Sequence, residues 1–284
     1  MTALPFATCD VFTGAPYGGN PLAIVEDAGS LSTAQMQLIA REFNLSETIF
    51  VQPPDDPANT ARVRIFFPTA EIPFAGHPTI GAAVALAQTG HGPDMVLELG
   101  VGPLKARATA QEASFDTRVP LEVLGQPAPA LVARALGLPK AALNLSTHAP
   151  TLASVGLPFT LTELASREAL AACTPETSAF REGAAAHKGS LDFAQFAYVR
   201  EGKTIPARMF APLDNIPEDP ATGSACAALG AFLAELHEKP LALTILQGED
   251  MGRPSLIHAQ AQQDPLRVSV SGTAVQTMAG QFML

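Results

Sequence analysis

The sequence predicts an α+β protein with two pseudo-symmetric lobes, in each of which a curved, barrel-like mixed β-sheet wraps around one central α-helix. Two observations support this fold class. The segment at 64–85 recurs in altered form at 208–227, so the 284 residues contain two related halves. Most other apolar segments are short and typical of strands, and they do not alternate with helices as in a parallel β–α–β array.

The repeated segment is recognised by its residue pattern. Five residues of the first copy recur at the same relative positions in the second copy, namely Arg64, Phe66, Pro68, Ile72 and Pro73. A His-Pro-x-x-Gly motif at 77–81 then corresponds to Asp-Pro-x-x-Gly at 219–223. A duplicated half-protein predicts two similar lobes that face each other across a cleft, with His77 and Asp219 contributed from opposite sides.

In the first half, Ser32 and Gln35 form a capping box at the start of a helix over 32–43. An alanine-rich helix is predicted at about 78–88, and Gly90 is expected to end it. The short runs typical of strands lie at 9–12, 21–25, 48–52, 61–67 and 96–99.

In the second half, Thr160 and Glu163 indicate a helix near 164–172, and a second alanine-rich helix is expected at 225–236. Strands are predicted at 193–200, 207–210, 241–247, 256–261, 266–272 and 273–282. We place an N-terminal lobe at 1–118, completed by the last strand at about 273–284. The C-terminal lobe then covers 119–272, after a proline- and glycine-rich linker near 117–129.

Composition narrows the classes of partner. The net charge of −10 and the isoelectric point near 5.0 argue against nucleic acid and anionic membranes as partners. No apolar run has the length of a membrane-spanning helix, and no signal peptide is recognised, so a cytoplasmic location is expected. The three scattered cysteines form no metal or redox motif, and the glycine-rich segment 14–20 does not match a dinucleotide-binding fingerprint.

The two repeated turns are candidate anion sites. Each opens a helix whose first backbone amides lack partners within the helix, and these amides together with the helix dipole favour a bound anion. A single turn of this kind is more often an ordinary helix cap. Two turns in corresponding places favour a joint site for a small carboxylate.

Glu47 is the candidate acid–base residue, because it lies between a helix and an apolar strand. Partial desolvation at such a position raises the pKa of a carboxyl group towards the useful range. The alternative is a solvated glutamate in a loop. Arg253, in a turn-rich segment, either binds a carboxylate or braces its own loop.

Six motifs now identify a resemblance that extends over nearly the whole chain. They are DVFT (10–13), GNPLAIV (19–25), SET (46–48), FAGHPTIGA (74–82), EDPATGSA (218–225) and QGEDMGRPS (247–255). With these motifs the sequence resembles the phenazine-biosynthesis isomerase-like (PhzF-like) family, whose fold is that of diaminopimelate epimerase. The resemblance implies two β-rich lobes, a homodimer, and no metal or organic cofactor.

The resemblance also implies roles for individual residues. Glu47 corresponds to the principal acid–base residue of the family, and His77 and Asp219 correspond to its supporting polar groups. The expected substrate-binding residues in these motifs are Asn20, Ser46, Gly76, Thr222, Gly223 and Ser224.

The expected function is a cofactor-independent isomerisation, in which a proton moves within a small carboxylated metabolite resembling an amino or hydroxy acid. One alternative is an amino-acid epimerase with carboxylate bases. Two thiol bases are disfavoured, because Cys226 has no cysteine partner in the first turn. Another alternative is a non-catalytic protein that binds a small carboxylate.

Overall fold

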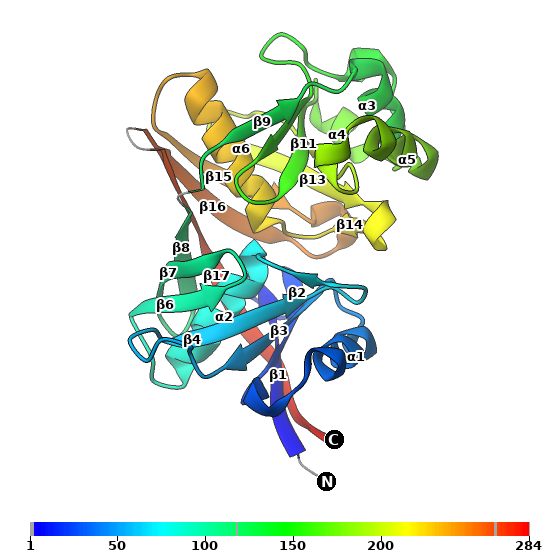
Figure 1. Cartoon of the computed structure of the whole chain (residues 1–284). Helices are drawn as coiled ribbons and strands as arrows, with labels where there is room; N and C mark the ends of the chain where they lie inside the picture. The colour runs from blue at the N-terminus through cyan, green and yellow to red at the C-terminus, as the bar shows by residue number, and fades with distance from the viewer. Residues whose placement is uncertain (1–2, 118, 264–265, 284) are drawn as a thin grey trace. The chain divides into compact units, whose positions relative to one another are not determined.

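The computed structural model describes residues 3–117, 119–263 and 266–283 (Figure 1). The chain divides into two compact units. Unit 1 is Met1–Asp116 together with Ser269–Leu284, and unit 2 is Thr117–Val268. The lobe boundaries predicted from the sequence, 1–118 with about 273–284 and 119–272, stay predictions.

Unit 1 is a closed sheet around one helix. Its helices are α1 (Thr33–Phe43), α2 (Gly76–Gln88) and the short η1 (Ala28–Ser30). Its strands are β1 (Ala3–Val11), β2 (Asn20–Val25), β3 (Glu47–Gln52), β4 (Ala61–Phe66), β5 (Glu71–Ile72), β6 (Asp94–Leu99), β7 (Gly102–Ala108), β8 (Glu112–Thr117) and β17 (Arg267–Met283). The pairing runs β1–β2–β3–β4–β6–β7–β8–β17 and returns to β1, with β2–β3 and β4–β6 parallel.

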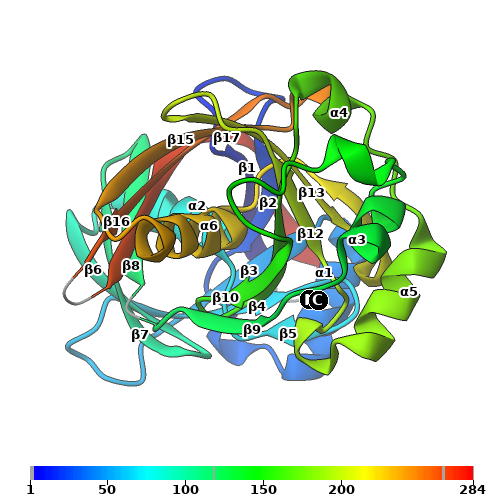
Figure 2. The same ribbon diagram turned by 90° about the horizontal axis from the view of Figure 1, so that it is seen from above.

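Helix α2 is the centre of unit 1, and it packs against β1, β2, β3 and β7 (Figure 2). A helix that is surrounded by strands must be apolar on every face and carry small side chains. The four alanines of α2 meet that requirement. At Gly81, a Cβ atom would lie 2.4 Å from Cδ2 of Leu22, so glycine allows the helix to approach β2 closely.

Unit 2 also has a mixed sheet around one central helix. Its helices are α3 (Pro129–Ala135), α4 (Arg167–Ala171), α5 (Thr177–Ala186) and α6 (Gly223–Leu236), with short turns η2 (Lys140–Ala142), η3 (Lys188–Ser190), η4 (Pro212–Asp214) and η5 (Glu249–Met251). Its strands are β9 (Glu122–Gly125), β10 (Thr151–Ser154), β11 (Pro158–Glu163), β12 (Gln195–Tyr198), β13 (Thr204–Ala211), β14 (Ile216–Asp219), β15 (Leu241–Gln247) and β16 (Ser255–Gln262). Helix α6 packs against β10, β11, β15 and β16.

The duplication is visible in the order of elements. The series β4, β5, α2, β6, β7 has the same order and pairing as β13, β14, α6, β15, β16, and both β4–β6 and β13–β15 are parallel. The predicted fold class is therefore confirmed: each unit is a mixed sheet around a central helix. The capping box of Ser32 and Gln35 is also present as predicted.

Three sequence-based assignments were wrong. Thr160 and Glu163 lie in β11, and the helix begins later, at Arg167 with Ser166 as its cap. Strand β11 is buried along almost its whole length, so it lacks the polar–apolar alternation that reveals most strands. Residues 122–125 of the supposed linker form β9, which pairs with β10. The two last predicted strands form the single strand β17.

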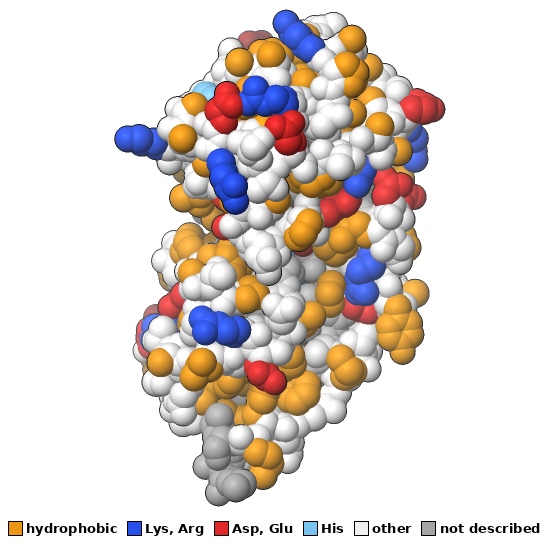
Figure 3. All heavy atoms as spheres, turned by 90° about the vertical axis from the view of Figure 1, so that its right-hand side faces the viewer, with side chains coloured by type: hydrophobic (Ala, Val, Ile, Leu, Met, Phe, Trp, Pro, Cys, Tyr) orange, Lys and Arg blue, Asp and Glu red, His pale blue; other side chains and the backbone are white. Residues whose placement is uncertain are grey.

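The surface drawn in Figure 3 carries charges of both signs interspersed among other side chains. The described part of the chain contains no helix long and apolar enough to cross a membrane.

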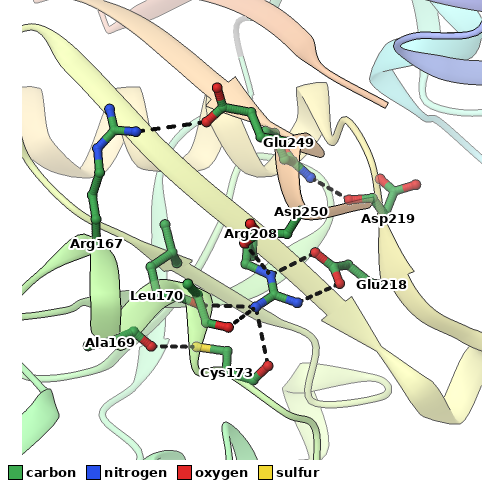
Figure 4. Close-up of polar contacts among 11 residues, drawn as sticks. Arg167, Ala169, Leu170, Cys173, Arg208, Glu218, Asp219, Glu249 and Asp250 are labelled. Carbon is green, nitrogen blue, oxygen red and sulfur yellow. Dashed lines mark hydrogen bonds and ion pairs between the residues drawn. The ribbon is translucent and has the colours of Figure 1, made fainter. Parts of the chain in front are cut away.

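One arginine in each unit fastens the strand that precedes the central helix. Arg64 binds Glu71 with two hydrogen bonds of 2.7 and 2.5 Å, and Arg208 binds Glu218 in the same way at 2.8 and 2.7 Å. Arg208 also donates to the backbone carbonyl oxygens at the end of α4 (Figure 4). It therefore joins α4 to β14, one residue before Asp219.

We expect Arg208→Lys to lower the free energy of unfolding by about 1–3 kcal/mol, because an ammonium group cannot reproduce the two-point contact and also bind the carbonyl oxygens. Arg64→Lys is the matched control. The side chain of its partner Glu71 is 39% exposed, against 16% for Glu218. Loss of the two-point contact between Arg64 and Glu71 should therefore lower the free energy of unfolding by about 1 kcal/mol or less. Urea denaturation of both variants measures the difference, and equal losses would contradict the role given to the α4 contacts.

Candidate active site

Glu47 and His77 form a buried pair in unit 1. Glu47 is the first residue of β3, directly after the turn that ends α1, and His77 is the second residue of α2. The Nε2 atom of His77 lies 3.6 Å from Oε2 of Glu47. The two residues are 2% and 8% exposed, so both work in a largely water-free environment.

Asn20 and Ser46 complete this cluster. The loop before Asn20 is shaped by Gly19, which has a φ of +59° and where a Cβ atom would meet the carbonyl oxygen of Val11 at 2.2 Å. Asn20 then begins β2, and β2 runs parallel to β3 with Leu22 opposite Glu47. The sheet register therefore places Asn20 beside the start of β3.

The Asn20 amide, in the orientation that it has here, selects one tautomer of the imidazole. Its Oδ1 atom accepts the hydroxyl hydrogen of Ser46 at 3.2 Å, and its amide nitrogen lies 3.3 Å from Nδ1 of His77. An amide nitrogen can only donate, so Nδ1 accepts and the ring hydrogen resides on Nε2. The N–H group of the neutral imidazole therefore faces Glu47.

Burial lowers the pKa of His77 from its ordinary value of 6.5 to about 3. The nearby Glu47 carboxyl group does not offset this loss of hydration, so the imidazole is neutral at pH 7. A neutral ring can donate a hydrogen bond without holding a permanent positive charge next to the glutamate.

The corresponding turn of unit 2 contains a second buried network. Asp219 ends β14, and Thr222 is the residue that precedes α6. The hydroxyl of Thr222 donates to Oδ2 of Asp219 at 2.5 Å, so its one hydrogen is used within the turn. Gln247, at the end of β15, contacts both of these residues.

Both central helices begin two residues earlier than predicted, at Gly76 and Gly223. His77 and Ser224 therefore belong to the first helical turn, where the backbone amides precede the first hydrogen bond inside the helix. The residues before the helices, Ala75 and Thr222, make no side-chain capping bond. The turns thus differ from ordinary side-chain caps.

The cysteine thiols are poor bases here. Burial raises the pKa of Cys9 to about 12, and burial together with the charge of Asp219 raises the pKa of Cys226 still further. Both thiols therefore stay protonated at neutral pH. In the described part of the chain, no three His, Cys, Asp or Glu side chains are grouped so that they could hold a metal ion.

Sequence analysis assigned no role to Gln247, although it opens the last of the six motifs. The pattern offered one signal, a polar side chain at the end of an otherwise apolar strand and directly before a glycine. Its contacts join residues 25 and 28 positions apart, so local sequence could not reveal them.

The chain is similar to known proteins over almost all of its length. Residues 9–280 match the family model described as phenazine biosynthesis-like protein. The chain is 36% identical to an uncharacterised isomerase of Mesorhizobium japonicum, with 97% of each chain covered. It is 35% identical to a trans-2,3-dihydro-3-hydroxyanthranilate isomerase of Pseudomonas fluorescens, covering 98% of this chain and 99% of that protein.

A solved structure supports the fold. The crystal structure of a Bacillus anthracis phenazine biosynthesis protein of the PhzF family superimposes with a TM-score of 0.88, at 22% identity and with 100% of both chains covered. The match of the family model and the two isomerase relatives together extend over almost all of the chain. This protein therefore belongs to the phenazine biosynthesis-like (PhzF) family and is an isomerase of that type.

Proposed function

We propose that the protein moves a proton within a small carboxylated metabolite without a cofactor, and that Glu47 is the group that carries the proton. The observation that supports this most is the buried pair of Glu47 with a neutral His77 whose N–H group faces it. His77 and Asp219 would support the reaction. Asn20, Ser46, Gly76, Thr222, Gly223 and Ser224 would hold the substrate directly or through these groups.

In the proposed reaction, the Glu47 carboxylate removes a proton from one carbon of the substrate. The electrons of that C–H bond form a new double bond, the existing double bond shifts, and the carbon at its far end receives the proton from Glu47. No atom or electron is gained or lost, so no oxidant or second substrate is needed.

The neutral state of His77 suits this cycle. Glu47 must alternate between the ionised and the protonated form. An imidazolium 3.6 Å away would favour the ionised carboxylate and weaken it as a base. A neutral N–H group stabilises the carboxylate less and so permits both forms.

The first substrate to test is trans-2,3-dihydro-3-hydroxyanthranilate, because the Pseudomonas fluorescens relative is named for it. If the protein leaves it unchanged, a panel of cyclic and acyclic amino and hydroxy acids can be screened by thermal stabilisation. A ligand at 100 times its Kd adds about 2.7 kcal/mol.

Epimerisation of an amino acid is the second candidate. It commonly requires a base on each side of one carbon, and the buried thiols Cys9 and Cys226 are unsuited to that task because their pKa values are raised. An epimerase would interconvert stereoisomers of one compound, whereas the proposed reaction produces a different double-bond isomer. Chiral chromatography and NMR of the product separate the two outcomes.

We expect Glu47→Gln to lower kcat by about 10²–10⁴-fold, the usual contribution of a general acid–base group, since an amide cannot exchange a proton with carbon. Glu42→Gln, at an exposed position of α1 in the same unit, is the control and should retain wild-type turnover. Near-wild-type turnover by Glu47→Gln, with the fold unchanged by circular dichroism, would remove Glu47 from the mechanism.

The neutral state of His77 predicts a specific pH dependence of stability. Below about pH 6.5 the unfolded chain binds a proton at this residue, whereas the folded protein does so only near pH 3. The contribution of His77 to the free energy of unfolding is therefore lost as the pH falls from about 6.5 to about 3. Between pH 7 and pH 5, we expect the wild type to lose about 2 kcal/mol more than His77→Gln.

Denaturation at both pH values measures this difference, and His258→Gln, an exposed residue of β16, is the control. Nitrogen-15 NMR of the wild type should show the ring hydrogen of His77 on Nε2. A ring that titrates near pH 6.5, or that carries its hydrogen on Nδ1, would contradict the arrangement with Asn20.

A further inference from the structure

Gln247 is a buried amide that lies outside the two repeated turns. It ends β15 and is only 1% exposed. Its Oε1 atom accepts a hydrogen bond from the backbone N–H of Thr222 at 3.1 Å. Its Nε2 atom donates to the backbone carbonyl oxygen of Asp219 at 2.8 Å and to the hydroxyl oxygen of Thr222 at 2.9 Å.

Two backbone groups determine the direction of every bond in this network. A backbone N–H can only donate and a carbonyl oxygen can only accept, so the amide of Gln247 has a single satisfied orientation. In that orientation Gln247 donates to the hydroxyl oxygen of Thr222. The hydroxyl hydrogen is then directed to Oδ2 of Asp219 at 2.5 Å.

The residue after Gln247 packs directly on the same turn. Gly248 has a φ of +76°, and a Cβ atom there would lie 2.7 Å from the carbonyl oxygen of Pro220 and 2.4 Å from that of Arg253. Figure 4 shows Asp219 beside Glu218, which Arg208 holds in place. The turn is therefore held by β15 at one point and by Arg208 at another.

We propose that Gln247 is a positioning residue, which orients the Thr222 hydroxyl as a donor and so keeps Asp219 in one orientation as a hydrogen-bond acceptor. A hydrogen bond that is donated to a carboxylate favours its ionised form. This proposal deepens the function proposed above and rests on it for any effect on turnover. Its effect on the titration of Asp219 does not depend on catalysis.

The test compares variants that interrupt the network at different points. Thr222→Val removes only the hydroxyl group and leaves the bonds from Gln247 to the backbone. Gln247→Met removes the amide at similar volume. It removes the acceptor of the Thr222 backbone N–H and one donor to the Asp219 carbonyl oxygen, so it is the variant at risk of misfolding. Thr222→Ser restores the hydroxyl group, and Thr244→Val, on β15 away from the turn, is the control.

The primary measurement is the pH titration of the Asp219 carboxyl carbon by carbon-13 NMR, assigned with Asp219→Asn. We expect its midpoint to rise by about 1 pH unit in Thr222→Val, since a hydrogen bond to a charged group contributes roughly that much. Gln247→Met should raise it as well, and the double variant should be no worse than the larger single effect because both act through one bond. Thr222→Ser and Thr244→Val should titrate like the wild type.

Turnover separates the two proposals. If Asp219 acts in the reaction, kcat of Thr222→Val should fall about tenfold with little change in KM, the effect of losing one charge-assisted hydrogen bond. A shifted titration with unchanged kcat supports the role of Gln247 and contradicts that of Asp219 in the reaction. An unchanged titration in Thr222→Val overturns the inference about Gln247, whether or not the enzyme turns over.

Discussion

The enclosure of each central helix by its own sheet is the constraint on which the other features depend. In unit 1 the strands close into a ring around α2, and every helix residue from Gly76 to Val84 is buried, so this part of the helix offers no exposed face for polar side chains. Every polar group of its first turn must then find a partner inside the protein, because an unpaired buried polar group is costly. Alanines along the helix and Asn20 beside His77 meet part of that demand, while Nε2 of His77 faces the Glu47 carboxyl group at 3.6 Å.

The same constraint explains the electrostatics of the site. Loss of hydration lowers the pKa of His77 to about 3, and a neighbouring side-chain amide decides which ring nitrogen keeps the hydrogen. In unit 2 an amide at the end of β15 fixes the hydroxyl of Thr222 in an equivalent way. Each unit thus uses one neutral amide to set the direction of hydrogen bonds around one titratable residue.

Much of this fold could be predicted from sequence, since the repeat identified both central helices and the strands before them. The failures have physical causes. Strand β11 is buried along most of its length, so its threonines and Glu163 imitated a helix start. Strand β7 does alternate, but two of its buried positions are the small Ala106 and Ala108, on either side of Arg107, so it carries a weak apolar signal. The homodimer and the cytoplasmic location stay predictions.

For the candidate site, the sequence predicted the main residues but not the contacts that orient them. Motifs identified Glu47, His77 and Asp219, because each lies in a short local pattern. The roles of Asn20 and Gln247 in fixing hydrogen-bond direction depend on sheet register and on contacts 57 and 25 residues apart, which no local pattern encodes.

The central claim is that a single carboxyl group both removes and returns the proton. The most direct measurement uses a substrate that carries deuterium at the carbon that loses its hydrogen, in a single turnover in ordinary water. The Glu47 side chain is only 11% exposed, which limits exchange with solvent, so we predict that part of the deuterium is found at the receiving carbon of the product. A product with no deuterium at that carbon would contradict transfer by one carboxyl group.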